Sequence, residues 1–396
     1  MFLDIINLDL KVEVKHKRMI PLSRFKIEFK NLKEIDKVIL FSMISLMIFG
    51  IVNIYLASAA EYGTIFLKRQ SIWFIICLVA LYFMLAIDYT MLKNYTPLFY
   101  WGSIVLLIVT MFIGTDINGA RGWIRLGPLS FQPAELAKIA TIMMLGKTLE
   151  EMNGTINDLK NFFTMAFYAI VPAVFIVIQP DMGMTMVLFF IVVGIFFIAG
   201  LDLRIIGGGL FSLLLIIVIV WNSGLIQEYQ KTRITSFLNP ESDTSQSGYQ
   251  LRQALISIGN GGVFGLQGNA ITKENSVGYA AQYVPEVQTD FIFASIAEQW
   301  GLAGAIFLLL LYGLLISRMI AIGRAAKDTF GSIICVGLVA YFLFALLQNI
   351  GMTIGLMPIT GITLPLLSYG GSSLLTTVMS IGLALNVGMR RKKIYF

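Results

Sequence analysis

The chain has 396 residues, of which 57% are hydrophobic and only 13% are charged, and its mean hydropathy is +0.80. Soluble domains carry about 25% charged residues, so this composition excludes an ordinary soluble protein and indicates a surface that faces lipid. The 29 Lys and Arg residues outnumber the 23 Asp and Glu residues, but no basic stretch is interleaved with aromatic residues, which argues against a nucleic-acid partner. The single histidine, His16, excludes a histidine-based triad in the apolar part of the chain.

Apolar runs near the length of a membrane span recur ten times along the sequence. About 20 apolar residues cross the hydrocarbon core, so we expect an all-α integral membrane protein with about ten transmembrane helices. A large extracellular loop, residues 223–290, separates the seventh helix from the eighth. The runs cover residues 38–58, 71–87, 96–114, 133–147, 163–179, 183–200, 205–222, 291–317, 330–352 and 371–389.

The distribution of basic residues predicts the orientation. An even number of crossings places both termini on one side, and most Lys and Arg residues then lie on that same side. Basic residues gather in cytoplasmic segments, so we expect cytoplasmic termini. The chain then divides into a cytoplasmic segment at residues 1–37, a membrane domain at 38–390 and a cytoplasmic tail at 391–396.

A basic cluster follows the third apolar run. Arg121 and Arg125 precede Pro133, a residue that suits the first turn of a helix. Glu135 and Lys138 should therefore share one helical face at a spacing of three. Two interpretations stay open: an ion pair within an interfacial aromatic belt, or a basic cluster that holds a phosphate group.

Three acidic residues lie near predicted outer helix ends. Asp181 follows Gln179-Pro180, which indicates either a tight turn with an exposed carboxylate or a site residue. Asp290 stands where the long loop enters the eighth helix, so it either caps that helix or acts as a base with a raised pKa. Glu298 lies two turns further, about 12 Å along the helix, where an ionisable residue is a functional candidate.

The long outer loop also predicts structure of its own. Leu251, Ala254, Leu255 and Ile258 recur at helical spacing, which indicates an amphipathic helix lying in the membrane interface. The glycines that follow lack the strand and the Gly-Lys-Ser/Thr of a nucleotide-binding loop, so we expect a flexible hinge. They are Gly261, Gly262, Gly265 and Gly268.

A Gly- and Pro-rich segment, residues 353–370, predicts a re-entrant element near the outer end of the ninth helix. Asn349 precedes it, and Ser368 lies within it. Polar residues thus converge on the predicted outer helix ends, while the inner loops are short. This pattern favours chemistry on, or capture of, an anionic membrane-borne substrate at the outer leaflet.

Four of these motifs, in this order, resemble the SEDS family (shape, elongation, division and sporulation), whose members are multi-pass peptidoglycan glycosyltransferases. The resemblance spans roughly residues 38–393. Within the family, residues 349–358 and 237–242 look more like the rod-shape branch than the division branch. Gln288 and Thr363 depart from the usual pattern, where histidine and proline are common. The motifs are residues 121–138, 179–181, 285–294 and 361–373.

The resemblance implies polymerisation of lipid II into glycan strands during cell elongation, at the outer face of the bacterial cytoplasmic membrane, by inverting glycosyl transfer. Asp290 matches the family's essential aspartate and is the expected general base. Arg121, Arg125 and Lys138 are expected to hold pyrophosphate, with Glu135 orienting Lys138. The remaining expected substrate-binding residues are Asp181, Glu298, Asn349 and Ser368.

The resemblance also implies partners and leaves alternatives open. We expect a class B penicillin-binding protein and other membrane proteins of the elongation complex. A divalent cation, Mg²⁺ or Mn²⁺, would share the phosphate charge, although no metal-ligand spacing shows it. The competing interpretations are a lipid II flippase, supported by the depth of Glu298, a division-type polymerase, and a purely structural scaffold.

Overall fold

The computed structural model describes residues 34–117, 120–127, 129–222, 231, 233, 235–237, 247–268 and 278–390. The expected N-terminal cytoplasmic segment therefore lies outside the described residues up to position 33, and the expected tail at 391–396 lies outside them entirely. The expected large loop at 223–290 is described only in part.

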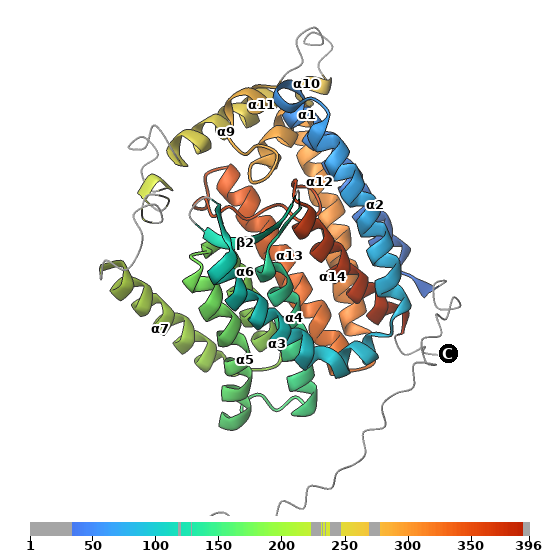
Figure 1. Cartoon of the computed structure of the whole chain (residues 1–396), viewed down its shortest axis with the longest axis vertical. Helices are drawn as coiled ribbons and strands as arrows, with labels where there is room; N and C mark the ends of the chain where they lie inside the picture. The colour runs from blue at the N-terminus through green and yellow to red at the C-terminus, as the bar shows by residue number, and fades with distance from the viewer. Residues whose placement is uncertain are drawn as a thin grey trace, which may run out of the picture.

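Helices dominate the described chain, and each of the ten apolar runs falls on one of them (Figure 1). Seven described helices, namely α1, α2, α3, α5, α12, α13 and α14, are long and apolar enough to cross a membrane. The chain is thus a multi-pass helical membrane protein, while the total of ten crossings stays a prediction. The ten helices are α1 (Lys37–Tyr62), α2 (Ile65–Ala86), α3 (Tyr89–Ile113), α4 (Pro133–Glu151), α5 (Leu159–Ile178), α6 (Met182–Ile198), α7 (Leu203–Asn222), α12 (Ile292–Arg324), α13 (Thr329–Thr353) and α14 (Gly371–Met389).

Helix α4 is less apolar than its neighbours because protein, rather than lipid, surrounds it. It packs against α3, α5, α6, α13 and α14, and most of its residues are buried. Pro133 is its first residue, as expected. A helix enclosed in this way can carry the charged residues Glu135 and Lys138 without exposing them to hydrocarbon.

Ion pairs tie together one end of the helical bundle. Each of the three pairs below joins two segments that the sequence predicts on the inner side. Segments expected on the same side of the membrane are therefore in contact in the structure. Which side of the membrane this end faces stays a prediction. The pairs are Arg318–Asp36 at 2.6 Å, Arg390–Asp88 at 3.2 Å, and Lys93–Glu150.

The segment between α3 and α4 corrects the expected all-α fold class. It forms a three-stranded antiparallel sheet in the order β1 (Thr115–Ile117), β2 (Ala120–Leu126), β3 (Leu129–Phe131). Gly127, with φ +63°, lies in the turn between β2 and β3, where a left-handed backbone suits glycine. Strands this short leave too brief an alternation to be recognised in the sequence.

Three shorter helices, α9 (Ser247–Gly261), α10 (Gly265–Gly268) and α11 (Tyr279–Tyr283), lie together at the other end of the bundle (Figure 1). Helix α9 confirms the expected helix, and it buries Leu251 and Ala254. The expected glycine hinge is wrong for Gly261 and Gly265, because each permits close packing on α12. A Cβ atom would lie 2.0 Å from the Ala297 carbonyl oxygen at the first position, and 2.3 Å from that of Gln299 at the second.

Residues 354–370 form a non-helical segment that is exposed near its start and buried at 364–368, as an element that re-enters the protein requires. Leu364 and Leu367 are buried within it. Helix α1 approaches it so closely that a Cβ atom on Gly50 would lie 2.9 Å from the Leu367 backbone. The Tyr312 hydroxyl donates to the Pro365 carbonyl. These contacts fix the segment beside the candidate site.

Candidate functional site

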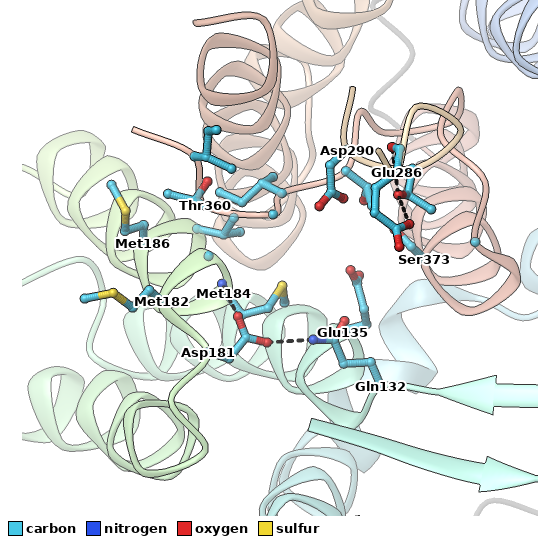
Figure 2. Close-up of a pocket in the computed structure, with 18 of the residues that line it drawn as sticks. Gln132, Glu135, Asp181, Met182, Met184, Met186, Glu286, Asp290, Thr360 and Ser373 are labelled. Atoms are coloured by element: carbon cyan, nitrogen blue, oxygen red, sulfur yellow. Dashed lines mark hydrogen bonds between the residues drawn. The ribbon is translucent and has the colours of Figure 1, made fainter. Parts of the chain in front are cut away.

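A cavity of about 410 Å³ opens where β2, α4 and α6 meet the segments that precede α12 and α14. Acidic side chains from separate elements face it, namely Glu135, Asp181, Glu286 and Asp290. Asp290 and Glu135 point toward one another across the space (Figure 2). The structure thus brings together three acidic residues singled out from the sequence, and it adds Glu286.

Asp290 belongs to the turn at residues 284–291, called here the Asp290 loop. Helix α12 begins at Ile292, and its cap residue is Phe291, so the N-cap interpretation of Asp290 is wrong. Within the described chain, no group donates a hydrogen bond to its carboxylate. Burial and, to a smaller extent, the charge of Glu286 raise the pKa of Asp290, while the charge of Arg233 lowers it, and the net result is a pKa of about 7.

Asn349 and Ser368 hold the Asp290 loop in place. The Asn349 side-chain amide donates to the carbonyl oxygens of Asp290 and Ile362, both at 2.8 Å. The Ser368 hydroxyl donates to the Thr289 carbonyl at 2.5 Å. Both side chains are buried, and neither lines the cavity. Their polar atoms bind backbone and position Asp290, and direct binding of substrate by either residue stays a prediction.

Asp181 combines the two interpretations that the sequence left open. Its carboxylate caps α6 by accepting from the Met184 backbone N–H at 2.9 Å. The other carboxylate oxygen accepts from the Gln132 side-chain amide at 2.7 Å, and the residue lines the cavity (Figure 2). Burial raises the pKa of Asp181. Gln132 was not expected at the site, although it stands directly before Pro133.

Glu135 and Lys138 form a buried ion pair, with 2.7 Å between ammonium and carboxylate. The Lys138 ammonium also lies 3.6 Å from the centre of the Tyr341 ring, and the Thr376 hydroxyl donates to Glu135 at 3.0 Å. Glu135 and Tyr341 line the cavity, whereas Lys138 does not. The expected pairing of residues three positions apart on one helix is confirmed. The pair is buried in the protein, and the Lys138 ammonium does not face the cavity in which a phosphate group would bind.

Arg121 and Arg125 lie on β2 with exposed side chains, and Trp123 between them lines the cavity. Alternate residues of a strand share a face, so the two guanidinium groups belong to the face that carries Trp123. Neither arginine lines the cavity, although the strand that carries both contributes Trp123 to it.

Glu298 is not brought to the cavity. Its carboxylate accepts hydrogen bonds from the backbone N–H groups of Tyr279 at 2.6 Å and Ala280 at 2.8 Å. These are the first two residues of α11, so Glu298 caps that short helix. Both carboxylate oxygens hold α11 against α12, and the expected role of Glu298 in substrate binding stays a prediction.

Arg233 is a cavity residue that the sequence did not single out as a site. Among the described residues that line the cavity, it is the basic one, against four acidic side chains. A Cβ atom on Gly361, where φ is +74°, would lie 3.5 Å from an Asp290 carboxylate oxygen and 4.0 Å from an Arg233 guanidinium nitrogen. Both distances are ordinary van der Waals contacts, so it is the positive φ, rather than a lack of space, that favours glycine beside the two charged groups.

The acidic residues do not form a metal site by themselves. In the part of the chain that the structure describes, no group of three or more His, Cys, Asp or Glu side chains is close enough to hold an ion. The described side chains therefore offer too few donors to hold a metal ion by themselves, and the divalent cation stays a prediction.

A model of a family of cell cycle proteins, FtsW/RodA/SpoVE, matches residues 36–393. Stage V sporulation protein E of Bacillus subtilis is 35% identical over 365 residues, covering 89% of this chain and 96% of the relative. Peptidoglycan glycosyltransferase MrdB of Escherichia coli K12 is 32% identical over 361 residues, covering 90% and 94%.

Solved structures give the same result for the fold. A chain from a peptidoglycan synthase complex, described in terms of structural coordination of polymerization and crosslinking, superposes with a TM-score of 0.77 at 31% identity. It covers 89% of this chain and 97% of that one. The rod shape determining protein RodA of Thermus thermophilus superposes with a TM-score of 0.69 at 30% identity, covering 91% and 98%.

Proposed function

Because the chain belongs to the SEDS family of FtsW, RodA and SpoVE, we propose that it is a peptidoglycan glycosyltransferase. It polymerises lipid II at the outer face of the bacterial cytoplasmic membrane. A relative that covers 90% of the chain carries the name peptidoglycan glycosyltransferase. The observation that carries the proposal is the Asp290 carboxylate, which faces the cavity and has a pKa near neutrality.

The proposed step is an inverting displacement with Asp290 as the general base. An acceptor sugar hydroxyl gives its proton to the Asp290 carboxylate while its oxygen forms a bond to the anomeric carbon of the donor. The bond from that carbon to the pyrophosphate oxygen breaks, and the lipid pyrophosphate leaves with the electron pair. A base is most effective when its pKa lies near the working pH, which burial provides here.

The pyrophosphate is assigned to the basic side chains at the acidic cavity. Arg233 lines it, and Arg121 and Arg125 lie on β2, the strand that contributes Trp123 to it. A planar guanidinium can bind a phosphate through two hydrogen bonds. Lys138 does not contact the pyrophosphate in this proposal. Its ion pair with Glu135 holds that carboxylate in place on α4, at the cavity.

A role in cell elongation, with a class B penicillin-binding protein and other elongation-complex membrane proteins as partners, extends the proposal. The rod-shape character of residues 349–358 supports it. So does the likeness to RodA and to a chain from a synthase complex that combines polymerization with crosslinking. The flippase alternative depended on Glu298, whose carboxylate binds the backbone of α11 away from the cavity.

The test is lipid II polymerisation by the purified Asp290→Asn variant. Loss of a general base typically lowers a rate by about 10²–10⁴-fold, while asparagine keeps the size of the side chain. Asp158→Asn, at the start of α5 outside the cavity, is the matched control and should keep the wild-type rate. A wild-type rate in Asp290→Asn would show that the catalytic assignment is wrong.

A further inference from the structure

Three aromatic side chains from separate elements form a continuous row, called here the aromatic rim. Tyr62 ends α1, Phe66 begins α2, and Tyr369 precedes α14. The rings of Tyr62 and Phe66 lie 4.9 Å apart at 71°, and those of Phe66 and Tyr369 lie 4.6 Å apart at 73°. Both pairs have the edge-to-face geometry that aromatic rings favour.

The aromatic rim starts at the cavity and ends at the protein surface. Tyr369 lines the cavity, and its backbone N–H donates to the Gln288 carbonyl of the Asp290 loop at 2.8 Å. At the other end, Tyr62 is 40% exposed. Its pKa is raised by a hydrogen bond to Glu61, and also by the charge of Glu286, another cavity residue. The rim therefore runs from the cavity to the outside of the protein.

Packing against lipid does not account for this arrangement. An aromatic side chain that faces lipid is largely exposed, as Phe112 is with 82% of its surface accessible. Phe66 is instead held between two other rings, and Tyr369 faces a cavity that combines apolar surface with acidic side chains. A row of aromatic rings and phenol groups beside such a cavity matches a ligand that has both C–H surfaces and hydroxyls.

We propose that the aromatic rim is a subsite for the sugar rings of the glycan strand next to the reacting bond. Sugar rings present C–H groups that pack on the negative face of an aromatic ring, and the Tyr62 and Tyr369 hydroxyls can donate to and accept from sugar hydroxyls. The inference rests on the proposed polymerase function. The aromatic rim would be the surface on which the part of the saccharide outside the cavity lies.

Binding to catalytically inactive protein tests the inference without depending on catalysis. The probe is a peptide-free GlcNAc–MurNAc tetrasaccharide without a lipid anchor, titrated by calorimetry into the Asp290→Asn protein in nanodiscs. Tyr62→Leu and Phe66→Leu, made in that background, keep apolar bulk and remove the ring faces. Each should weaken binding by roughly 2- to 10-fold, the range expected for one aromatic contact.

Tyr82→Leu is the matched control, because Tyr82 lies on the same helix as Phe66 and is 42% exposed. It should leave the affinity unchanged. Absence of tetrasaccharide binding to the parent protein, or equal affinities in the rim and control variants, would overturn the subsite. In active protein, Phe66→Leu should also shorten the glycan products, whereas failure of the unmutated protein to consume lipid II would overturn the polymerase function instead.

Discussion

The pH dependence of polymerisation follows from the surroundings of Asp290. With a pKa of about 7, about one tenth of this carboxyl group is ionised at pH 6 and about nine tenths at pH 8. A general base acts in its ionised form, so kcat/KM should rise tenfold per pH unit below the midpoint and level off above it. An ordinary aspartate, with a pKa near 3.8, would give a flat profile over this range.

Two substitutions should move that midpoint in opposite directions. Glu286→Gln removes a negative charge that raises the pKa of Asp290, so the acid limb should shift to lower pH. Arg233→Gln removes a positive charge that lowers it, so the limb should shift to higher pH. Because Glu286 is exposed, solvent screening should limit its shift to about one pH unit or less.

The assay is the initial rate of lipid II polymerisation at low substrate concentration between pH 5.5 and 8.5. The substrate phosphates titrate in the same way for every variant. The difference between the pH midpoints of the two variants therefore reports the protein alone. Equal midpoints for both variants, or shifts in the same direction, would refute the electrostatic account of Asp290.

Three further outcomes are expected. Asn349→Leu removes the hydrogen bonds that hold the Asp290 loop and should lower kcat with little change in KM; an unchanged kcat would contradict the positioning role. Arg121→Ala should raise KM for lipid II while the protein keeps its wild-type yield and melting midpoint. Lys138→Ala leaves Glu135 buried without its partner, so it should lower the free energy of unfolding by about 3–5 kcal/mol, which a lower yield and melting midpoint would show. A cysteine placed in α9 should react with an impermeant maleimide added outside the cell, since both native cysteines are buried; labelling only from the cytoplasm would reverse the proposed orientation.

Local patterns predicted the helices and part of the site. Length and hydropathy sufficed for the membrane helices, because a span needs a long apolar run whatever its neighbours are. Pro133, Glu135 and Lys138 were placed correctly because helical spacing fixes which side chains meet. The position of Asp290 between a polar loop and an apolar helix was enough to make it a candidate base.

What the sequence could not show depended on contacts between distant segments. Arg233 reaches the cavity from the segment between α7 and α9, whose sequence does not indicate which distant residues its side chain will meet. Asn349 and Ser368 bind backbone carbonyls of another segment. The sequence does not show in which direction those carbonyl groups point, so it could not reveal this role. The N–H groups that Glu298 binds belong to a helix about twenty residues earlier in the chain, so the sequence around Glu298 does not indicate them.

The backbone break in α12 divides a 33-residue helix into two mechanical units. At Gly301 the φ angle is +63°, and the N–H groups of Leu302 and Ala303 donate to the carbonyls of Gly262 and Val263 instead of continuing the helix ladder. An unbroken helix transmits force along its axis as a stiff rod. Here the first portion of α12, which follows the Asp290 loop, is hydrogen-bonded at the break to the segment between α9 and α10, so we expect a displacement of α9 and α10 to reach Asp290 more directly than it reaches the portion of α12 beyond Gly301.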